Sequence, residues 1–224
     1  KSAKIEQIVE NNIKTRRGWK PLVVGEDVDR YVVTPSRIIR INVAGINYKS
    51  QEVFEKRKIL IRKTGVGIKA AIDESGALTN QVVFHYRLDP KQKAPSFLLD
   101  YFLGVLCSRV LLAHHLKRFG ENEWRSHPYI TQRIISELPI PDLKEGAWQW
   151  RQARAIAEAA ARRRKRSAPH VPDDLMVDCL VAGLYGLSER DCGWVLKVLD
   201  SAQALEPIRS LRVNDPHSLR PIKV

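Results

Sequence analysis

The densest group of side chains able to bind an anion lies in the segment Phe54–Lys69, which holds six cations and one acid in sixteen positions. The cations are Lys56, Arg57, Lys58, Arg62, Lys63 and Lys69. The pattern predicts a strand, a glycine turn and a returning strand, with Lys58, Leu60 and Arg62 on one face. Lys63 and Thr64 then enter the turn. A glycine-rich turn lets a phosphate approach, and arginine is the usual bidentate reader of guanine. A solvated hairpin edge that blocks aggregation is the alternative.

Other cations could extend such a surface. Arg16, Arg17 and Lys20 follow a predicted first helix, where they could equally complement the helix dipole. Further basic residues on or beside predicted strands are Arg37, Arg40 and Lys49. The run Arg162–Arg166 lies at a predicted helix C-terminus, where we expect its cations mainly to remain hydrated.

The loop Trp124–Tyr129 mixes aromatic, basic and hydroxyl side chains before a short helix. Its Arg125 and His127, together with Arg133 in the helix that follows, are candidates for contacts with bases or phosphates. Alternatively, the two aromatic residues at its ends only anchor a long connection to the core. The candidate DNA-binding residues are therefore Arg62, Lys63, Thr64, Lys69, Arg125, His127, Arg133, Arg17 and Arg37.

Motifs that would carry catalysis are missing from the sequence. There is no Pro-Pro pair for a base-flipping methyltransferase loop, no Gly-rich turn leading into a helix for S-adenosylmethionine, and no P-loop. Asp89-Pro-Lys91 and Asp142-Leu-Lys144 match only half of a Mg²⁺-dependent nuclease motif. His114 and His115 are adjacent on a predicted helix and point about 100° apart, so we expect them at the helix rim rather than on a metal. We therefore expect no catalytic site and no metal site in this chain.

Composition agrees with a polyanionic partner. The 224 residues include 38 Lys and Arg against 25 Asp and Glu, which gives a net charge of +13. Cys107, Cys179 and Cys192 are far apart, so we expect buried free thiols in a reducing compartment. No apolar run reaches the length of a membrane span and no leader is recognisable, so a cytoplasmic protein is expected. Because Lys1 is no initiator, we expect a piece of a longer polypeptide.

The elements that must position these residues change in character near residue 90. We expect a helix over 4–14 and then strands at Pro21–Val24, Tyr31–Thr34, Arg37–Val43, Lys58–Lys63, Ile68–Ile72 and Gln81–Leu88. Helices follow at about 96–118, 130–137, 148–166, 173–185 and 188–203. The prediction is an α+β fold, in which a β-rich lobe is braced by a long helix and followed by a helical C-terminal segment.

The order of these segments resembles the target recognition domains of type I and type IIG restriction–modification enzymes and related adenine DNA methyltransferases. Lys20–Tyr31 is similar to an entry segment of the form Gly-x-Asp-Ile-x-Arg-Tyr, and Lys58–Gly65 to the family's central strand. Phe97–Ser108 resembles a helix ending in Leu-Asn-Ser, although Cys107 stands where the family commonly has Asn. Tyr129–Pro141 resembles the closing segment and Asp178–Glu189 a helical tail.

The resemblance implies a target recognition domain over residues 1–143 and a helical C-terminal segment over 144–224. It implies sequence-specific binding of double-stranded DNA, with an N-terminal methyltransferase domain, and possibly a nuclease domain, outside this chain. S-adenosylmethionine or Mg²⁺ would be bound by such a companion domain and not by this chain. A stand-alone metal-dependent nuclease, a helical protein-interaction scaffold and an RNA-binding protein are the alternatives.

Overall fold

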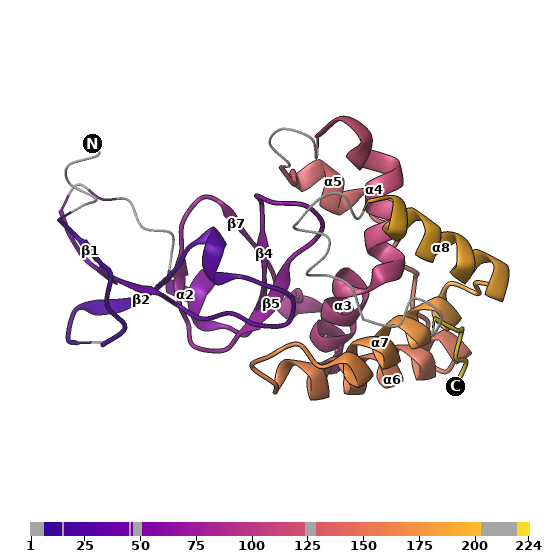
Figure 1. The fold of residues 1–224 in the computed structure, drawn as a ribbon. Helices are drawn as coiled ribbons and strands as arrows, with labels where there is room; N and C mark the ends of the chain where they lie inside the picture. The colour runs from indigo at the N-terminus through magenta and orange to yellow at the C-terminus, as the bar shows by residue number, and fades with distance from the viewer. Residues whose placement is uncertain (1–6, 15, 45, 47–50, 124–128, 203–218) are drawn as a thin grey trace.

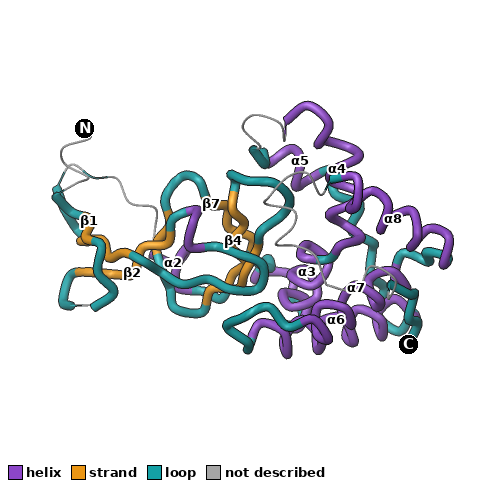
Figure 2. The backbone as a smooth tube through the Cα atoms, in the orientation of Figure 1, coloured by secondary structure: helices purple, strands orange, loops and turns teal. Residues whose placement is uncertain are grey.

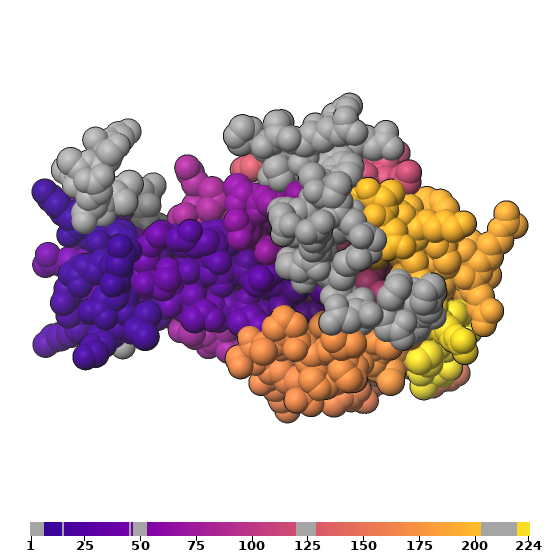
Figure 3. Space-filling model, viewed as in Figure 1, coloured from indigo at the N-terminus to yellow at the C-terminus, as the bar shows by residue number. Residues whose placement is uncertain are grey.

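The computed structural model describes residues 7–14, 16–44, 46, 51–123, 129–202 and 219–224. Strands occupy one end of the molecule and helices the other (Figures 1 and 2). The same division is visible in the space-filling view, where the N-terminal part forms one end and the last helices the other (Figure 3). The predicted α+β fold class is confirmed.

Two small sheets form the β-rich end. The first has the order β1 (Val9–Glu10), β3 (Arg37–Arg40), β2 (Trp19–Val23) and β6 (Leu78–Thr79), with only the β2–β6 pair parallel. The second has β4 (Lys58–Arg62) between β5 (Ala70–Asp73) and β7 (Val83–Tyr86), all antiparallel. Short helices connect the strands: η1 (Gly25–Asp27), α2 (Gln51–Glu55) and η2 (Pro90–Gln92).

The helical end contains α3 (Phe97–Cys107), α4 (Arg109–Glu123), α5 (Gln132–Ser136), α6 (Trp148–Arg164), α7 (Val171–Leu184) and α8 (Glu189–Ser201). One hydrophobic core runs from β4 and β5 through α3 into α6, α7 and α8. Gly104 allows α3 and α6 to approach closely in it, because a Cβ there would lie 2.8 Å from Ile156 Cγ2 on α6. The predicted division of the chain after residue 143 stays a prediction, and the core crosses it.

Three predicted elements are wrong. The expected helix over 4–14 is not formed in its described part, because Val9 and Glu10 pair with Ile39 and Ile38 of β3 as a strand. The β-branched side chain of Val9 also packs against the core beneath this sheet, and Asn11 and Asn12, which are poor helix formers, follow it.

The expected strand Tyr31–Thr34 is instead a loop with one isolated bridge, Val28 to Val33. Tyr31 adopts a left-handed φ of 67°, which interrupts extended backbone, and its N–H bonds to Ala70 O.

The expected single helix over 96–118 is divided at Ser108, whose backbone is extended with ψ of 150°. The Ser108 hydroxyl donates to Val105 O and accepts from Leu111 N, so one side chain ends α3 and caps α4. Within the described residues no single helix is long and apolar enough to span a membrane; α3 and the start of α4 meet that criterion only together, and they are bent by 57°.

Candidate nucleic-acid interface

The β4–β5 turn is built around Arg62 and Thr64. Arg62 N donates to Lys69 O at 3.0 Å and closes the turn, while Arg62 Nε donates to Thr64 Oγ1 at 3.2 Å. Gly65 has a φ of 107°, a conformation that side-chain-bearing residues rarely adopt. The turn is therefore a defined structure in which the Arg62 guanidinium lies beside the hydroxyl of Thr64.

Lys63 and Lys69 flank this turn and both have partners within the chain. The Lys63 ammonium lies 4.3 Å from the centre of the Phe84 ring and donates to Gln81 O. Lys69 Nζ lies 3.2 Å from the exposed carboxylate of Asp29. Both cations are only half-buried, so their heads are kept near the protein surface.

The segment that precedes α5 is joined to this turn. Ile130 N donates to Lys63 O at 2.6 Å, and Thr64 forms an isolated antiparallel bridge with Tyr129. Tyr129 is 45% exposed at this junction. Four residues further, the Arg133 side chain is 85% exposed and pairs with Glu137 at 2.6 Å. Thr131 caps α5 by accepting from Ile134 N, which fixes where Arg133 emerges.

Arg37 joins the same region through η1. Its guanidinium donates to Glu26 Oε1 at 2.7 Å and to Asn11 Oδ1 at 3.1 Å. The residue before Glu26, Gly25, packs against the turn, because a Cβ there would lie 3.6 Å from Thr64 Oγ1 and 3.8 Å from Arg62 Cγ. Arg17 is exposed in the connection between β1 and β2, in the same sheet as Arg37.

The structure thus brings Arg62, Lys63, Thr64, Lys69 and Arg133 together and connects Arg37 to them, while Arg17 lies apart. We call the joined set of Arg62–Lys69 and Tyr129–Arg133 the turn surface. Arg125 and His127 lie outside the described residues. Sequence reasoning missed Tyr129 as a structural partner of Thr64, since bridges between distant segments leave no local pattern.

The prediction that β4 presents a cationic face with Lys58, Leu60 and Arg62 is wrong for Lys58. Its side chain has 0% exposure and donates to Asp73 Oδ2 and Phe54 O, because the antiparallel register places Lys58 opposite Asp73 on the same face of the sheet. Burial alone would raise the pKa of Asp73, but hydrogen bonds from Lys58 and Ser75 outweigh it and hold that pKa below its ordinary value. Leu60 is buried as well. Within β4 itself, therefore, only Arg62 at the turn end presents a cation.

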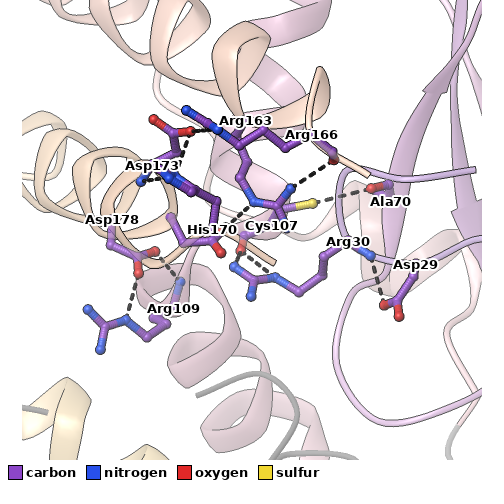
Figure 4. A network of polar contacts seen from close by, with 11 residues as sticks. Asp29, Arg30, Ala70, Cys107, Arg109, Arg163, Arg166, His170, Asp173 and Asp178 are labelled. Atoms are coloured by element: carbon purple, nitrogen blue, oxygen red, sulfur yellow. Dashed lines mark hydrogen bonds and ion pairs between the residues drawn. The ribbon is translucent and has the colours of Figure 1, made fainter. Parts of the chain in front are cut away.

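The basic run at the end of α6 is also different from the expected hydrated cluster. Arg163 is buried and pairs with Asp174 at 2.9 Å, Arg164 pairs with Asp100 at 2.9 Å, and Arg166 pairs with Asp173 at 2.8 Å. Figure 4 shows part of this network at the place where α6 and α7 meet the β-rich end. These cations connect elements of the fold.

Arg30 and Arg109 are two further arginines drawn in Figure 4, and each is held at the junction between α3 and α4. Arg30 donates from Nε to Cys107 O at 3.0 Å and from Nη2 to the same oxygen. Arg109 is held by Asp178, which accepts from its backbone N at 2.8 Å and from its Nε at 2.6 Å. Sequence reasoning gave neither arginine a role, although Arg30 lies in the Gly-x-Asp-x-x-Arg-Tyr pattern.

Of the two adjacent histidines, only His114 is partly exposed as expected for a helix rim, whereas His115 is not. His115 is buried against Phe119, and burial lowers its pKa to about 4, with a further contribution from His114. Within the described ranges, no group of three or more His, Cys, Asp or Glu side chains is arranged to hold a metal ion. The three cysteines are buried and free, as expected.

The family model of the TaqI-like C-terminal specificity domain matches residues 20–140, which include β2 from its second residue, β3 to β7, α3 to α5 and the whole turn surface. No curated protein matches the chain.

Proposed function

Since the chain belongs to the family of TaqI-like C-terminal specificity domains, we propose that it recognises a double-stranded DNA sequence through the turn surface. Family membership supports a role as the DNA-recognising part of a restriction–modification system. The proposal adds which residues make the contact and what lies outside the chain.

The observation that carries the proposal is the junction of Lys63 and Thr64 with Tyr129 and Ile130. It joins two segments that are distant in the sequence and that carry cations inside the matched region, and hydrogen bonds fix their backbones. Fixed cations can set the register of a protein on the phosphate backbone, which reading a sequence requires.

We assign different roles to the cations according to the exposure of each side chain and its contacts within the chain. Arg133 is the most exposed, so it is suited to a phosphate. Arg62 lies beside Thr64 at the turn, where an arginine and a hydroxyl together can address base edges in the major groove. Lys63 and Lys69 add positive potential while keeping their internal partners.

The catalytic steps are proposed to belong to companion domains outside this chain, a methyltransferase domain and possibly a nuclease domain. S-adenosylmethionine or Mg²⁺ would be bound there. In that arrangement this chain recognises the DNA sequence, and the companion domain performs the reaction in its own pocket. A cytoplasmic location belongs to the same proposal.

Selection from a pool of random duplexes tests the proposal. The chain should enrich one short sequence over several rounds, and the Arg62→Ala variant should lose preference at one or two base pairs while keeping weaker overall binding. Enrichment of no sequence, with binding that depends on charge alone, would contradict recognition. Mg²⁺-dependent cutting of plasmid DNA by the chain would instead support the stand-alone nuclease.

A further inference from the structure

A groove of about 620 Å³ lies between α4 and α8. Its apolar wall comes from Val110, Leu111, Leu187 and Val195, with Trp194 and Pro139 at the sides. The hydroxyl of Tyr185 donates to Pro139 O at 2.7 Å, so this side of the groove is held in place by a hydrogen bond. This volume is in the range of sites that bind a ligand or a side-chain cluster.

Trp194 is the unusual residue of this groove, since its side chain is 50% exposed. Its neighbours Cys192 and Val195 turn into the core, and a Cβ at Gly193 would meet no atom within 4 Å. An indole that lines a groove without being covered is typical of the anchor positions at protein interfaces.

The charges around the groove are one-sided. Lys117 and Arg118 are exposed on the α4 side. Asp191 lies on the α8 side, but its carboxylate already accepts from the backbone N and the hydroxyl of Ser188. Since Asp191 is committed to capping α8, the cationic side has no counterpart among the groove's other lining residues.

The shape and the charges together suit a helix. The lining residues of α4 run from Val110 to Arg118, about 12 Å or two turns along the axis. A channel between two packed helices accepts an amphipathic helix through apolar residues at i, i+4 and i+7. Carboxylates beside those residues would meet Lys117 and Arg118. A second copy of this chain is disfavoured, because its net charge of +13 would oppose the same cations.

We propose that the groove between α4 and α8 docks an acidic amphipathic helix of a partner protein, with Trp194 as its apolar anchor and Lys117 and Arg118 as its charge partners. The proposed DNA contact does not require this surface. The two proposals can therefore fail independently.

The test uses the full chain and a labelled helical peptide of about 15 residues that carries leucines at i, i+4 and i+7 with glutamates beside them. A matched peptide has lysine in place of each glutamate. Fluorescence anisotropy should show binding of the glutamate peptide alone. Trp194→Ala should weaken it about tenfold or more, whereas Trp148→Ala, a partly exposed tryptophan on α6, should leave it unchanged.

Charge reversal provides the second variant, which does not depend on the core. Lys117→Glu with Arg118→Glu, both exposed, should transfer the preference to the lysine peptide. Circular dichroism should remain unchanged in all three variants, and duplex DNA affinity should remain unchanged in Trp194→Ala and Trp148→Ala, which separates this proposal from the DNA interface.

Several results would overturn the proposal. These are equal binding of both peptides, no binding up to millimolar peptide, or an affinity that Trp194→Ala and the charge reversal leave unchanged. Competition by duplex DNA would make the groove a nucleic-acid surface instead. Self-association of the chain in sedimentation that Trp194→Ala abolishes would make it an interface between two copies.

Discussion

Arg30 and Cys107 are 77 positions apart, and the guanidinium of Arg30 donates twice to the carbonyl oxygen of Cys107. That carbonyl is at the last residue of α3, where the helix leaves carbonyl groups without partners of its own. The contact ties the loop after η1, whose Asp29 pairs with Lys69 of the turn surface, to the end of the helix that carries the core. The Arg163 guanidinium lies 5.0 Å from the centre of the Tyr31 ring beside it.

Replacing Arg30 should weaken this joint. We expect Arg30→Met to lower the free energy of unfolding by about 2 kcal/mol, because hydrogen bonds to a charged donor are lost from a part-buried carbonyl. Urea denaturation of the wild-type and variant chains measures this change in the free energy of unfolding. Arg16→Met, which removes an exposed pair with Glu10 and a contact with the Trp19 ring, should cost less than about 1 kcal/mol. Equal losses in the two variants would contradict a role for Arg30 at the joint.

Two helical glycines should respond in opposite directions to the same substitution. Gly104→Ala places a methyl group 2.8 Å from Ile156 Cγ2 and 3.2 Å from Ala160 Cβ, so we expect a loss of about 1–3 kcal/mol. Gly193→Ala enters open space on α8 and should stabilise by about 0.5–1 kcal/mol through helix propensity. Thermal unfolding of the two variants measures both. A neutral Gly104→Ala would mean that α3 and α6 are not closely packed.

Removing one partner of the buried pair Arg109–Asp178 should be costly. Asp178→Ala leaves the buried Arg109 guanidinium without its carboxylate, and we expect a loss of about 3–5 kcal/mol. The double variant Arg109→Leu with Asp178→Leu should recover much of it, since neither charge then remains buried. Chemical denaturation of the three proteins measures this. A double variant as unstable as Asp178→Ala would contradict the explanation.

The buried His115 predicts a pH dependence of stability. Burial lowers its pKa from 6.5 to about 4 in the folded chain, so between these values the unfolded chain binds more protons. The contribution of the neutral His115 imidazole to the free energy of unfolding is therefore fully present above pH 6.5. It falls as the pH is lowered toward 4, and the loss reaches about 2–3 kcal/mol at pH 4.5. His115→Leu should remove this part of the dependence. An unchanged profile between pH 6.5 and 4.5 would contradict it.

The predicted helices of the second half were close to the observed ones because their apolar periodicity is long and their ends are marked. Ser188 and Asp191 form a capping box at α8, and Pro172 lies in the first turn of α7. The break at Ser108 was missed, because it depends on Asp178, which holds the start of α4 from 69 residues away. No local pattern contains that partner.

The candidate site was predictable in position but not in detail. The glycine turn after β4 and the cations beside it were visible in the sequence, and the structure places them at one surface with Arg133. Which cations are buried depends on the pairing of distant segments. Lys58 alternates with apolar neighbours like an exposed residue, yet the register of β4 with β5 places it opposite Asp73, and both side chains are buried.

The central claim concerns the turn surface as the DNA contact, and the dependence of duplex affinity on salt tests it most directly. For the wild-type chain, the logarithm of the association constant should fall linearly with the logarithm of salt concentration. Arg62→Ala with Lys63→Ala should weaken binding several-fold or more and reduce the slope by about 1–2. The control Arg190→Ala with Lys197→Ala removes two exposed cations from α8 and should change neither. If the control variant loses as much affinity and slope as the turn variant, the DNA contact does not lie at the turn surface.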